Sequence, residues 1–177
     1  DMDKAIDRLI MAKDHNQVIL IIGDYDTDGT SAASLLHLYF KSLQIDNYYY
    51  IPHRQKEGYG ISKKAIDYGI QIGAELIISC DCGITAIEQI DYANSKQIDF
   101  IITDHHKQKE TLPNAYAILN PNQHDCDYPF KGLCGAGVAL KFCIGINNRL
   151  GNNIDEVFQY LDLVAIATIA DVMPVLD

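Results

Sequence analysis

Short apolar runs alternate with longer amphipathic segments along most of the chain. Residues 18–22 form a continuous apolar run, which is typical of a parallel strand covered on both faces. Similar runs, rich in β-branched or aromatic residues, follow at intervals, and Pro52 ends one of them. The pattern predicts strands at residues 18–22, 48–51, 76–79 and 100–103, with a last short strand at 117–119.

The segments between these runs have the apolar spacing of helices, and Ser62 is a good N-cap for one of them. They predict helices at 3–13, 30–42, 62–68 and 85–95. A polar loop at 120–133 precedes two further predicted helices, at 137–148 and 154–169. Strands separated by helices imply an α/β fold, in which a parallel β-sheet is flanked by helices on both faces and followed by C-terminal helices. Ligands of such sheets bind at the carboxyl ends of the strands.

The composition is that of a globular domain, with 177 residues of which 48% are hydrophobic and 21% charged. No apolar run approaches the roughly 20 residues needed to cross a bilayer, and no signal peptide is visible at the start of the chain. The cysteines form no even set, and the spacing of Cys80 and Cys82 favours packing at a strand end over a zinc or redox motif. We therefore expect reduced thiols, a cytoplasmic location and no membrane partner.

The formal net charge of −10 argues by itself against nucleic acid, because binding to phosphates normally requires a basic surface. A cluster of metal-binding carboxylates would account for part of the negative charge, since bound cations neutralise it. Alternatively, a basic DNA-binding surface lies on a part of the protein outside these residues. The chain lacks an initiator Met and stops abruptly, so we expect it to be a piece of a longer protein.

Acidic and imidazole side chains follow three of the predicted strands. Asp24, Asp26 and Asp28 come after the first strand, Asp81 after the third, and the triplet 104–106, Asp-His-His, after the fourth. A single Asp in such a place is most often a turn former or a helix cap. Three alternating carboxylates would repel one another at the end of a buried strand, and a divalent cation removes that cost. An EF-hand calcium loop is excluded, because the twelfth position counted from Asp24 is Leu35 and not Glu.

Asp171 lies in an otherwise apolar helical segment, where a lone buried carboxylate is costly. One interpretation is that it caps a neighbouring loop; metal ligation explains it better. Two metals about 3.5–4 Å apart and bridged by a carboxylate are a standard arrangement for phosphoester hydrolysis by an activated water. Asp81 is the natural bridging candidate because its strand lies between the others.

These residues resemble the motifs of the DHH phosphoesterase family, and more closely its RecJ branch. The resemblance runs from about residue 18 to residue 174 and rests on the order of the motifs. They are Asp24-Tyr-Asp-Thr-Asp-Gly29, Pro52-His-Arg-Gln-Lys-Glu-Gly-Tyr-Gly60, Asp81-Cys-Gly83, Asp104-His-His106, Cys134-Gly-Ala-Gly-Val-Ala139 and Ile169-Ala-Asp-Val-Met-Pro174.

The resemblance implies two divalent cations, with Mn²⁺ favoured over Mg²⁺ because imidazole takes part. The implied metal ligands are Asp26, Asp28, Asp81, His105 and Asp171, with Asp24 completing or supporting one site. Asp81 would bridge the metals, His106 would contact the scissile phosphate, and Asp104 would orient a histidine. Asp81, His105 and His106 are therefore the expected catalytic group.

Substrate contacts are expected from a second set of residues. Arg54 and His53 follow a strand and suit phosphate, although Arg54 paired with Glu57 is an equally good interpretation. Tyr59 suits stacking on a base. Gly135 and Gly137 precede a helix whose free N–H groups suit a phosphate, and Asn120 would shape the same loop.

The implied function is a 5′→3′ exonuclease specific for single-stranded DNA that acts in DNA repair and recombination. Residues 1–177 would be its catalytic DHH domain, with a DHH-associated domain and an oligonucleotide-binding domain outside them. Expected partners are single-stranded DNA and, for the whole protein, a single-stranded-DNA-binding protein and a helicase. One alternative is another enzyme of the family, a family II inorganic pyrophosphatase or an oligoribonuclease/pAp phosphatase. The first motif of those enzymes begins with a His that is missing here. The other alternative is a non-catalytic module, which would lack metal ligands.

Overall fold

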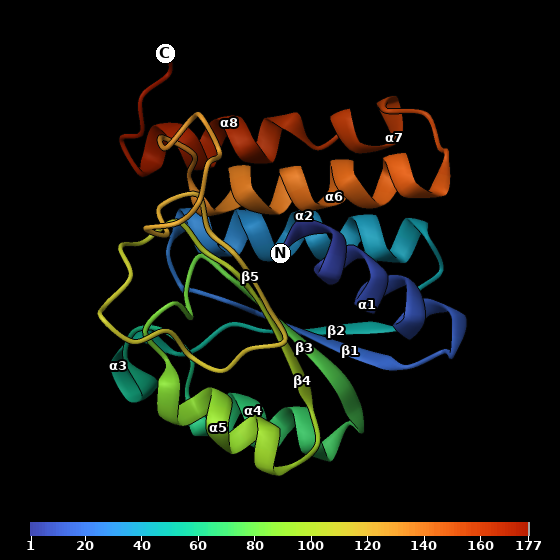
Figure 1. The fold of residues 1–177 in the computed structure, drawn as a ribbon, viewed down its shortest axis with the longest axis vertical. Coiled ribbons are helices and arrows are strands. Elements are labelled where there is room, and N and C mark those ends of the chain that lie inside the picture. Colours follow the sequence, from blue (N-terminus) through green and yellow to red (C-terminus); the bar gives the residue numbers. More distant parts are fainter. Residues whose placement is uncertain (177) are drawn as a thin grey trace.

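The computed structural model describes residues 1–176, which form a single five-stranded parallel sheet between layers of helices (Figure 1). The predicted α/β architecture is thereby confirmed. The strand order is β2-β1-β3-β4-β5, and every neighbouring pair is parallel. The strands are β1 (Val18–Gly23), β2 (Asn47–Tyr50), β3 (Ala74–Cys80), β4 (Asp99–Thr103) and β5 (Ala117–Leu119).

One face of the sheet is covered by helices from both ends of the chain, and these pack with it into the larger apolar core (Figure 1). Alternate strand residues such as Ile19, Ile21 and Ile78 point into this core, as the two-residue period of a strand requires. The helices on this side are α1 (Met2–Asp14), α2 (Thr27–Ser42), α6 (Gly135–Leu150), α7 (Asp155–Phe158) and α8 (Leu161–Ala170).

The opposite face of the sheet carries a smaller core, in which Leu20, Ile77 and Phe100 meet the helices between β2 and β4. Those helices are α4 (Lys63–Gln71) and α5 (Ile87–Ser95). The one-turn α3 (Arg54–Glu57) buries no residue and lies at the carboxyl end of the sheet (Figure 1). The expected cap of α4 is present, because Oγ of Ser62 accepts a hydrogen bond from the N–H of Ala65. No helix among residues 1–176 is both long and apolar enough to cross a bilayer.

The predicted helix at 154–169 is wrong, because the structure breaks this segment into α7 and α8 at Gln159 and Tyr160. Two further differences lie at the carboxyl end of the sheet. α2 begins at Thr27 and not at residue 30, since Asp26 is its N-cap and accepts a hydrogen bond from the N–H of Gly29. The short helix α3 was not predicted at all.

The order of the strands reverses direction between β1 and β3, since β2 lies on one side of β1 and the later strands follow on the other. In an open parallel sheet such a reversal leaves a crevice beyond the carboxyl ends of the two strands. Asp24 follows β1 and Asp81 follows β3, so both lie at this point.

Candidate metal centre

Asp28 belongs to one helix and is hydrogen-bonded to the N-terminus of another that is distant in sequence. It lies in the first turn of α2, and its carboxylate oxygens accept hydrogen bonds from the N–H groups of Gly135 (2.5 Å) and Ala136 (2.7 Å) at the start of α6. Two N–H groups at a helix N-terminus favour a negative charge. Burial works the other way and raises the pKa of Asp28 above its usual value despite these bonds.

Asp24 is buried directly after β1. Its Oδ1 accepts a hydrogen bond from the N–H of Gly60 (3.3 Å), whereas its Oδ2 is buried without any hydrogen-bond partner among residues 1–176. Burial raises the pKa of Asp24. A side chain on Gly29 would place its Cβ 2.5 Å from the backbone nitrogen of Asp24, so the motif needs glycine there for α2 to approach the strand end.

Asp81 follows β3 in a left-handed conformation, with φ of 60°. Among residues other than glycine, Asp and Asn adopt this conformation most readily, and such residues often mark functional sites. The Cβ of a side chain at Gly135 would lie 2.5 Å from Cβ of Asp81, so glycine is required for this close approach. Burial and the charge of Asp28 outweigh the neighbouring His105 and raise the pKa of Asp81 to about 7.

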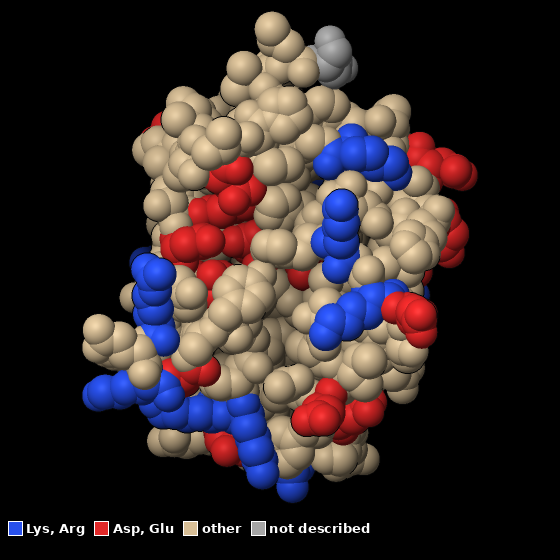
Figure 2. Space-filling view, turned by 90° about the vertical axis from the view of Figure 1, so that its left-hand side faces the viewer, with Lys and Arg blue, Asp and Glu red and all other residues tan. Residues whose placement is uncertain are grey.

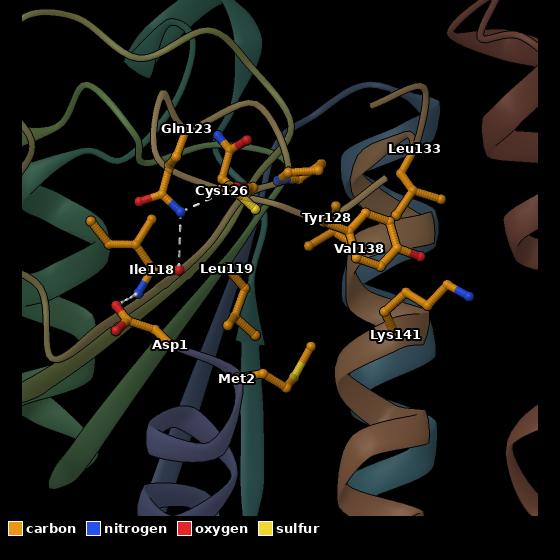
Figure 3. A pocket seen from close by; sticks show the side chains of 12 residues that line it. Asp1, Met2, Ile118, Leu119, Gln123, Cys126, Tyr128, Leu133, Val138 and Lys141 are labelled. Carbon is orange, nitrogen blue, oxygen red and sulfur yellow. Dashed lines mark hydrogen bonds between the residues drawn. The ribbon is translucent and has the colours of Figure 1, made fainter. Parts of the chain in front are cut away.

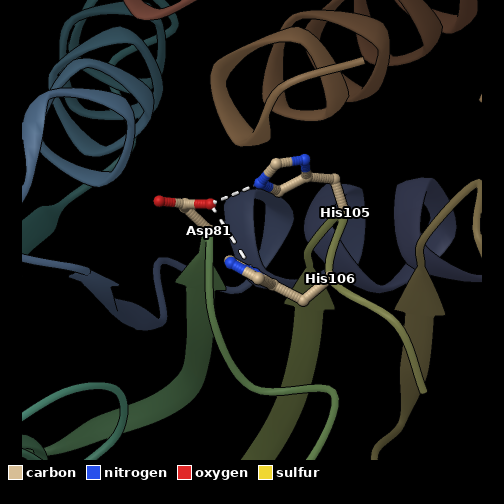
Figure 4. Close-up of side chains that lie close together, drawn as sticks. All are labelled: Asp81, His105 and His106. Carbon is tan, nitrogen blue, oxygen red and sulfur yellow. Dashed lines mark ion pairs between the residues drawn. The ribbon is translucent and has the colours of Figure 1, made fainter. Parts of the chain in front are cut away.

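His105 lies at the centre of three carboxylates (Figure 4 shows its contact with Asp81). Its Nε2 is 3.1 Å from Oδ1 of Asp81, 3.6 Å from Oδ2 of Asp171 and 3.7 Å from Oδ2 of Asp28. Burial alone would lower the pKa of His105, but Asp81 more than compensates, and the pKa is raised.

His106 is held by Asp104, whose Oδ1 accepts hydrogen bonds from the N–H groups of His105 and His106 and from Nδ1 of His106 (2.8 Å). Oδ2 of Asp104 accepts the N–H of Ile84. These bonds overcome burial and lower the pKa of Asp104. The bond to Asp104, opposed in part by burial, raises the pKa of His106 to about 9. His106 is therefore an imidazolium at neutral pH, and its Nδ1 lies 3.9 Å from Oδ1 of Asp81 (Figure 4).

The prediction that Asp171 is buried inside a helix is wrong. Asp171 is the residue that follows α8, and its side chain is 33% exposed. α8 ends there because Val172 has a left-handed φ of 53° and the N–H of Met173 turns back to the carbonyl of Thr168. The turn nevertheless leaves the Asp171 carboxylate beside His105.

Three groups of side chains each bring one potential ligand atom per residue within 4.8 Å of one another. They are Asp24, Asp26 and Asp81; Asp28, His105 and Asp171; and Asp81, His105 and His106. Oδ1 of Asp81, like Oδ2 of Asp24, is buried with no hydrogen-bond partner in the described part of the chain. A buried carboxylate oxygen without a partner is costly unless a cation is nearby. Carboxylate and imidazole ligands of this kind fit two adjacent divalent cations such as Mn²⁺ or Mg²⁺.

Arg54 does not pair with Glu57: its guanidinium lies over the ring of Tyr25, with Cζ 5.2 Å from the centroid. Glu57 is bound instead by Tyr50, Ser62, Lys64 and the backbone N–H of His53.

His53 caps α3 and is exposed, on the same loop as Arg54. Tyr59, also on this loop, points its hydroxyl at the imidazole of His106 (3.2 Å from Nε2) and at the carbonyl of Asp81 (3.4 Å). The loop from β2 to α4 therefore reaches over the carboxylate cluster.

The expectation that Gly135 offers a free N–H to a phosphate is wrong, because Asp28 already occupies that N–H. The N–H of Gly137 is likewise taken, by Sγ of Cys134. Asn120 does shape a loop, but it is the loop of the Asp-His-His triplet: its amide donates to the carbonyl of His106. Asn122 was missed from the sequence, although it lies only two residues further along and donates to the carbonyl of His105.

Asp and Glu side chains gather in one hollowed area of the molecular face at the carboxyl end of the sheet, and Lys and Arg side chains lie on both sides of it (Figure 2). A strongly acidic chain thus presents cations on either side of its acidic cluster. Such an arrangement suits a phosphate backbone that crosses the cluster.

A separate pocket of about 270 Å³ lies between β5, the loop that follows it and α6 (Figure 3). Its walls are mostly apolar, with Ile118, Leu119, Leu133 and Val138 among them, and none of the predicted metal ligands lines it. This pocket is therefore distinct from the carboxylate cluster.

The comparisons with known proteins agree with this geometry. The DHH family, N-terminal domain, matches residues 18–168. The chain is similar to the single-stranded-DNA-specific exonucleases RecJ of Bacillus subtilis (44% identical over 178 residues) and Escherichia coli K12 (37% over 183 residues). These alignments cover 99% and 98% of the chain but 22% and 32% of the relatives, so it spans less than a third of their length. A crystal structure of exonuclease RecJ bound to manganese superposes with a TM-score of 0.89 at 32% identity, over 98% of this chain and 43% of that one.

Proposed function

This chain belongs to the DHH family, and from that membership we propose that it is a metal-dependent phosphodiesterase domain that cleaves single-stranded DNA from the 5′ end. The observation that carries the proposal is the contact between Asp81 and His105. It places Asp81, of the group with Asp24 and Asp26, beside His105, of the group with Asp28 and Asp171, so the two ligand sets are adjacent.

Residues of these two groups would hold a pair of divalent cations, with Asp81 between them. When bound, such a pair supplies an acidified water as nucleophile and neutralises charge on the phosphate. Manganese is favoured because His105 contributes a nitrogen ligand, and because a similar structure carries manganese.

His106 would act on the phosphate rather than on the metals. The Asp104 carboxylate raises the pKa of His106 and so favours its protonated form, and the ring is 44% exposed beside the cluster. A cation in this place can stabilise the charge that develops on a phosphate oxygen or give a proton to the leaving oxygen. Tyr59 restrains the same ring through its hydroxyl.

The DNA strand would run across the acidic cluster between the basic side chains on its two sides (Figure 2). Arg54 is exposed and lies over the ring of Tyr25, between Asp24 and Asp26 in the sequence, so its guanidinium can bind a phosphate near the cluster. A role for the whole protein in DNA repair and recombination in the cytoplasm, with a single-stranded-DNA-binding protein and a helicase as partners, is part of the same proposal and rests on the family resemblance.

The first test is the stoichiometry of metal binding. Isothermal titration of the metal-free chain with Mn²⁺ is expected to give two sites. One site or none would contradict a pair of cations with Asp81 between them.

The second test separates the substrates of the family. The chain with Mn²⁺ is offered 5′-labelled single-stranded DNA, pyrophosphate and pAp in parallel. We expect mononucleotides from the DNA and slower turnover of the other two. Preferential hydrolysis of pyrophosphate or pAp would identify a different branch of the family.

A further inference from the structure

His105 and His106 lie beyond the end of the sheet, and the side-chain amides of two asparagines donate hydrogen bonds to their backbone carbonyls. Both residues follow β4, and no backbone N–H among residues 1–176 donates to either carbonyl. Nδ2 of Asn122 donates to the carbonyl of His105 (2.5 Å), and Nδ2 of Asn120 donates to the carbonyl of His106 (2.8 Å). We call Asn120 and Asn122 the asparagine clamp.

The N–H groups of the same two histidines are held from the other direction, by Oδ1 of Asp104. Each histidine is therefore fixed through its N–H by a carboxylate and through its C=O by an amide. Side chains thus do what a neighbouring strand would do for a residue inside the sheet.

The asparagine clamp is itself held in place. The N–H of Asn122 donates to Oδ1 of Asn120 (2.7 Å), so one member orients the other. Nε2 of Gln123 donates to the carbonyls of Asn120 and Ile118, at the edge of the pocket in Figure 3. Nζ of Lys131 donates to the carbonyl of Pro121 (2.6 Å). The amides therefore have little freedom to follow a histidine that moves.

We propose that Asn122 is a positioning residue for the metal ligand His105, and that Asn120 is a positioning residue for His106 at the phosphate. The proposal rests on the proposed function, because it assigns separate tasks to the two histidines. Side chains that orient metal ligands typically change metal affinity by roughly 10–100-fold when they are removed.

The division of labour distinguishes this proposal from a purely structural role of the loop. If the asparagine clamp only stabilised the fold, loss of either Asn would lower the melting temperature. Neither loss would then change Mn²⁺ affinity and kcat to different extents. If the proposal holds, loss of Asn122 mainly weakens Mn²⁺ binding, whereas loss of Asn120 mainly lowers kcat and weakens Mn²⁺ binding to a clearly smaller extent.

The matched control is Asn94, whose amide donates to the carbonyl of Asn114 (2.9 Å) on the exposed surface of α5. Asn94→Ala removes the same kind of bond far from the carboxylate cluster and changes no charge. Asn122→Gln keeps the amide donor and serves as the rescue variant.

The experiment is calorimetric titration of the metal-free variants with Mn²⁺, at a temperature well below the lowest melting temperature of the set. Asn122→Ala is expected to bind Mn²⁺ roughly 10–100-fold more weakly than wild type. Asn122→Gln is expected to recover most of that loss, and Asn94→Ala to bind as wild type does. Equal Mn²⁺ affinity of Asn122→Ala and wild type, or an equal loss in Asn94→Ala, overturns the assignment of Asn122.

Steady-state cleavage of single-stranded DNA at saturating Mn²⁺ tests the assignment of Asn120 as the positioning residue for His106. Asn120→Ala is expected to lower kcat about 10-fold or more, and to weaken Mn²⁺ binding clearly less than Asn122→Ala does, because Asn120 reaches Asn122 only through the backbone N–H of Asn122. A kcat equal to wild type, or a fall in Mn²⁺ affinity as large as that of Asn122→Ala, overturns the assignment of Asn120. A wild-type chain that binds no Mn²⁺ would contradict the proposed function itself, and that result is distinct from the failure of a single variant.

Discussion

Nε2 of His105 lies 3.1 Å from Oδ1 of Asp81, an oxygen that is buried and has no hydrogen-bond partner in the described part of the chain. Asp81 and His105 come from the ends of neighbouring strands, β3 and β4. Asp28, Asp81 and Asp171 surround this single imidazole, so negative charge is in excess at a site that is largely closed to solvent. The metal-free site is therefore less stable than its surroundings, and this has consequences for stability, pH dependence and metal binding.

Asp81→Asn is expected to stabilise the metal-free protein while removing its tightest metal binding. The substitution replaces a buried carboxylate that faces Asp28 with a neutral amide, and Asn tolerates the left-handed φ of this position as well as Asp does. We expect about 1–3 kcal/mol of added stability without metal, and at least a 100-fold loss of Mn²⁺ affinity.

Urea denaturation of the metal-free proteins and Mn²⁺ calorimetry check the two effects separately. Asp67→Asn is a suitable control, since Asp67 lies on α4, outside the cluster. A destabilised Asp81→Asn protein would show that the carboxylate has a structural role in the absence of metal.

Mn²⁺ binding is expected to strengthen as pH rises from about 5.5 to 8. Burial raises the pKa of Asp81 to about 7, so the metal-free carboxyl is substantially protonated at neutral pH, and a bound cation must displace that proton. Calorimetry in buffers of different ionisation enthalpy should show proton release at pH 6.5 that declines by pH 8. Binding that is independent of buffer and pH would mean that Asp81 is ionised before the metal arrives.

Glu57 is expected to contribute stability that is lost in acid. Burial opposes its ionisation, but hydrogen bonds from Tyr50, the N–H of His53 and Ser62 prevail and lower the pKa of Glu57 to about 2. Because the folded pKa lies below the unfolded value of roughly 4.3, the contribution is complete above that pH and disappears as pH falls toward 2.

Glu57→Gln should therefore destabilise the protein by about 1–3 kcal/mol at pH 7, and by clearly less at pH 3. Denaturant unfolding of both proteins at the two pH values measures the difference. Glu110→Gln, on an exposed loop, is the control and should change little at either pH.

Val172→Gly is expected to stabilise the turn that carries Asp171. Val172 is 87% exposed and has a left-handed φ of 53°, which is strained for a β-branched residue and easy for glycine. The relieved strain should exceed the added entropy of the unfolded chain and raise stability by about 0.5–1 kcal/mol. Val175→Gly is the control, because Val175 is similarly exposed but has no positive φ, so it should not be stabilised.

The sequence by itself determined the sheet and the edge at which chemistry occurs. Continuous apolar runs such as residues 18–22 have to be buried on both faces, and this forces parallel strands with helices on either side. Parallel strands present their carboxyl ends at one edge, so Asp24, Asp81 and His105 had to converge whatever the details of packing.

Tertiary structure alone decided which partner each of these side chains has. The bond from Gly135 to Asp28 spans 107 residues, and the bond from Asn122 to His105 joins two irregular loops, so no local pattern encodes either. The break between α7 and α8 was also hidden, since neither Gln159 nor Tyr160 is a helix breaker and the sequence gives one continuous helical pattern. The periodicity of apolar residues indicates which face of a helix or strand is buried. Hydrogen-bond partners depend instead on how separate elements are placed against one another.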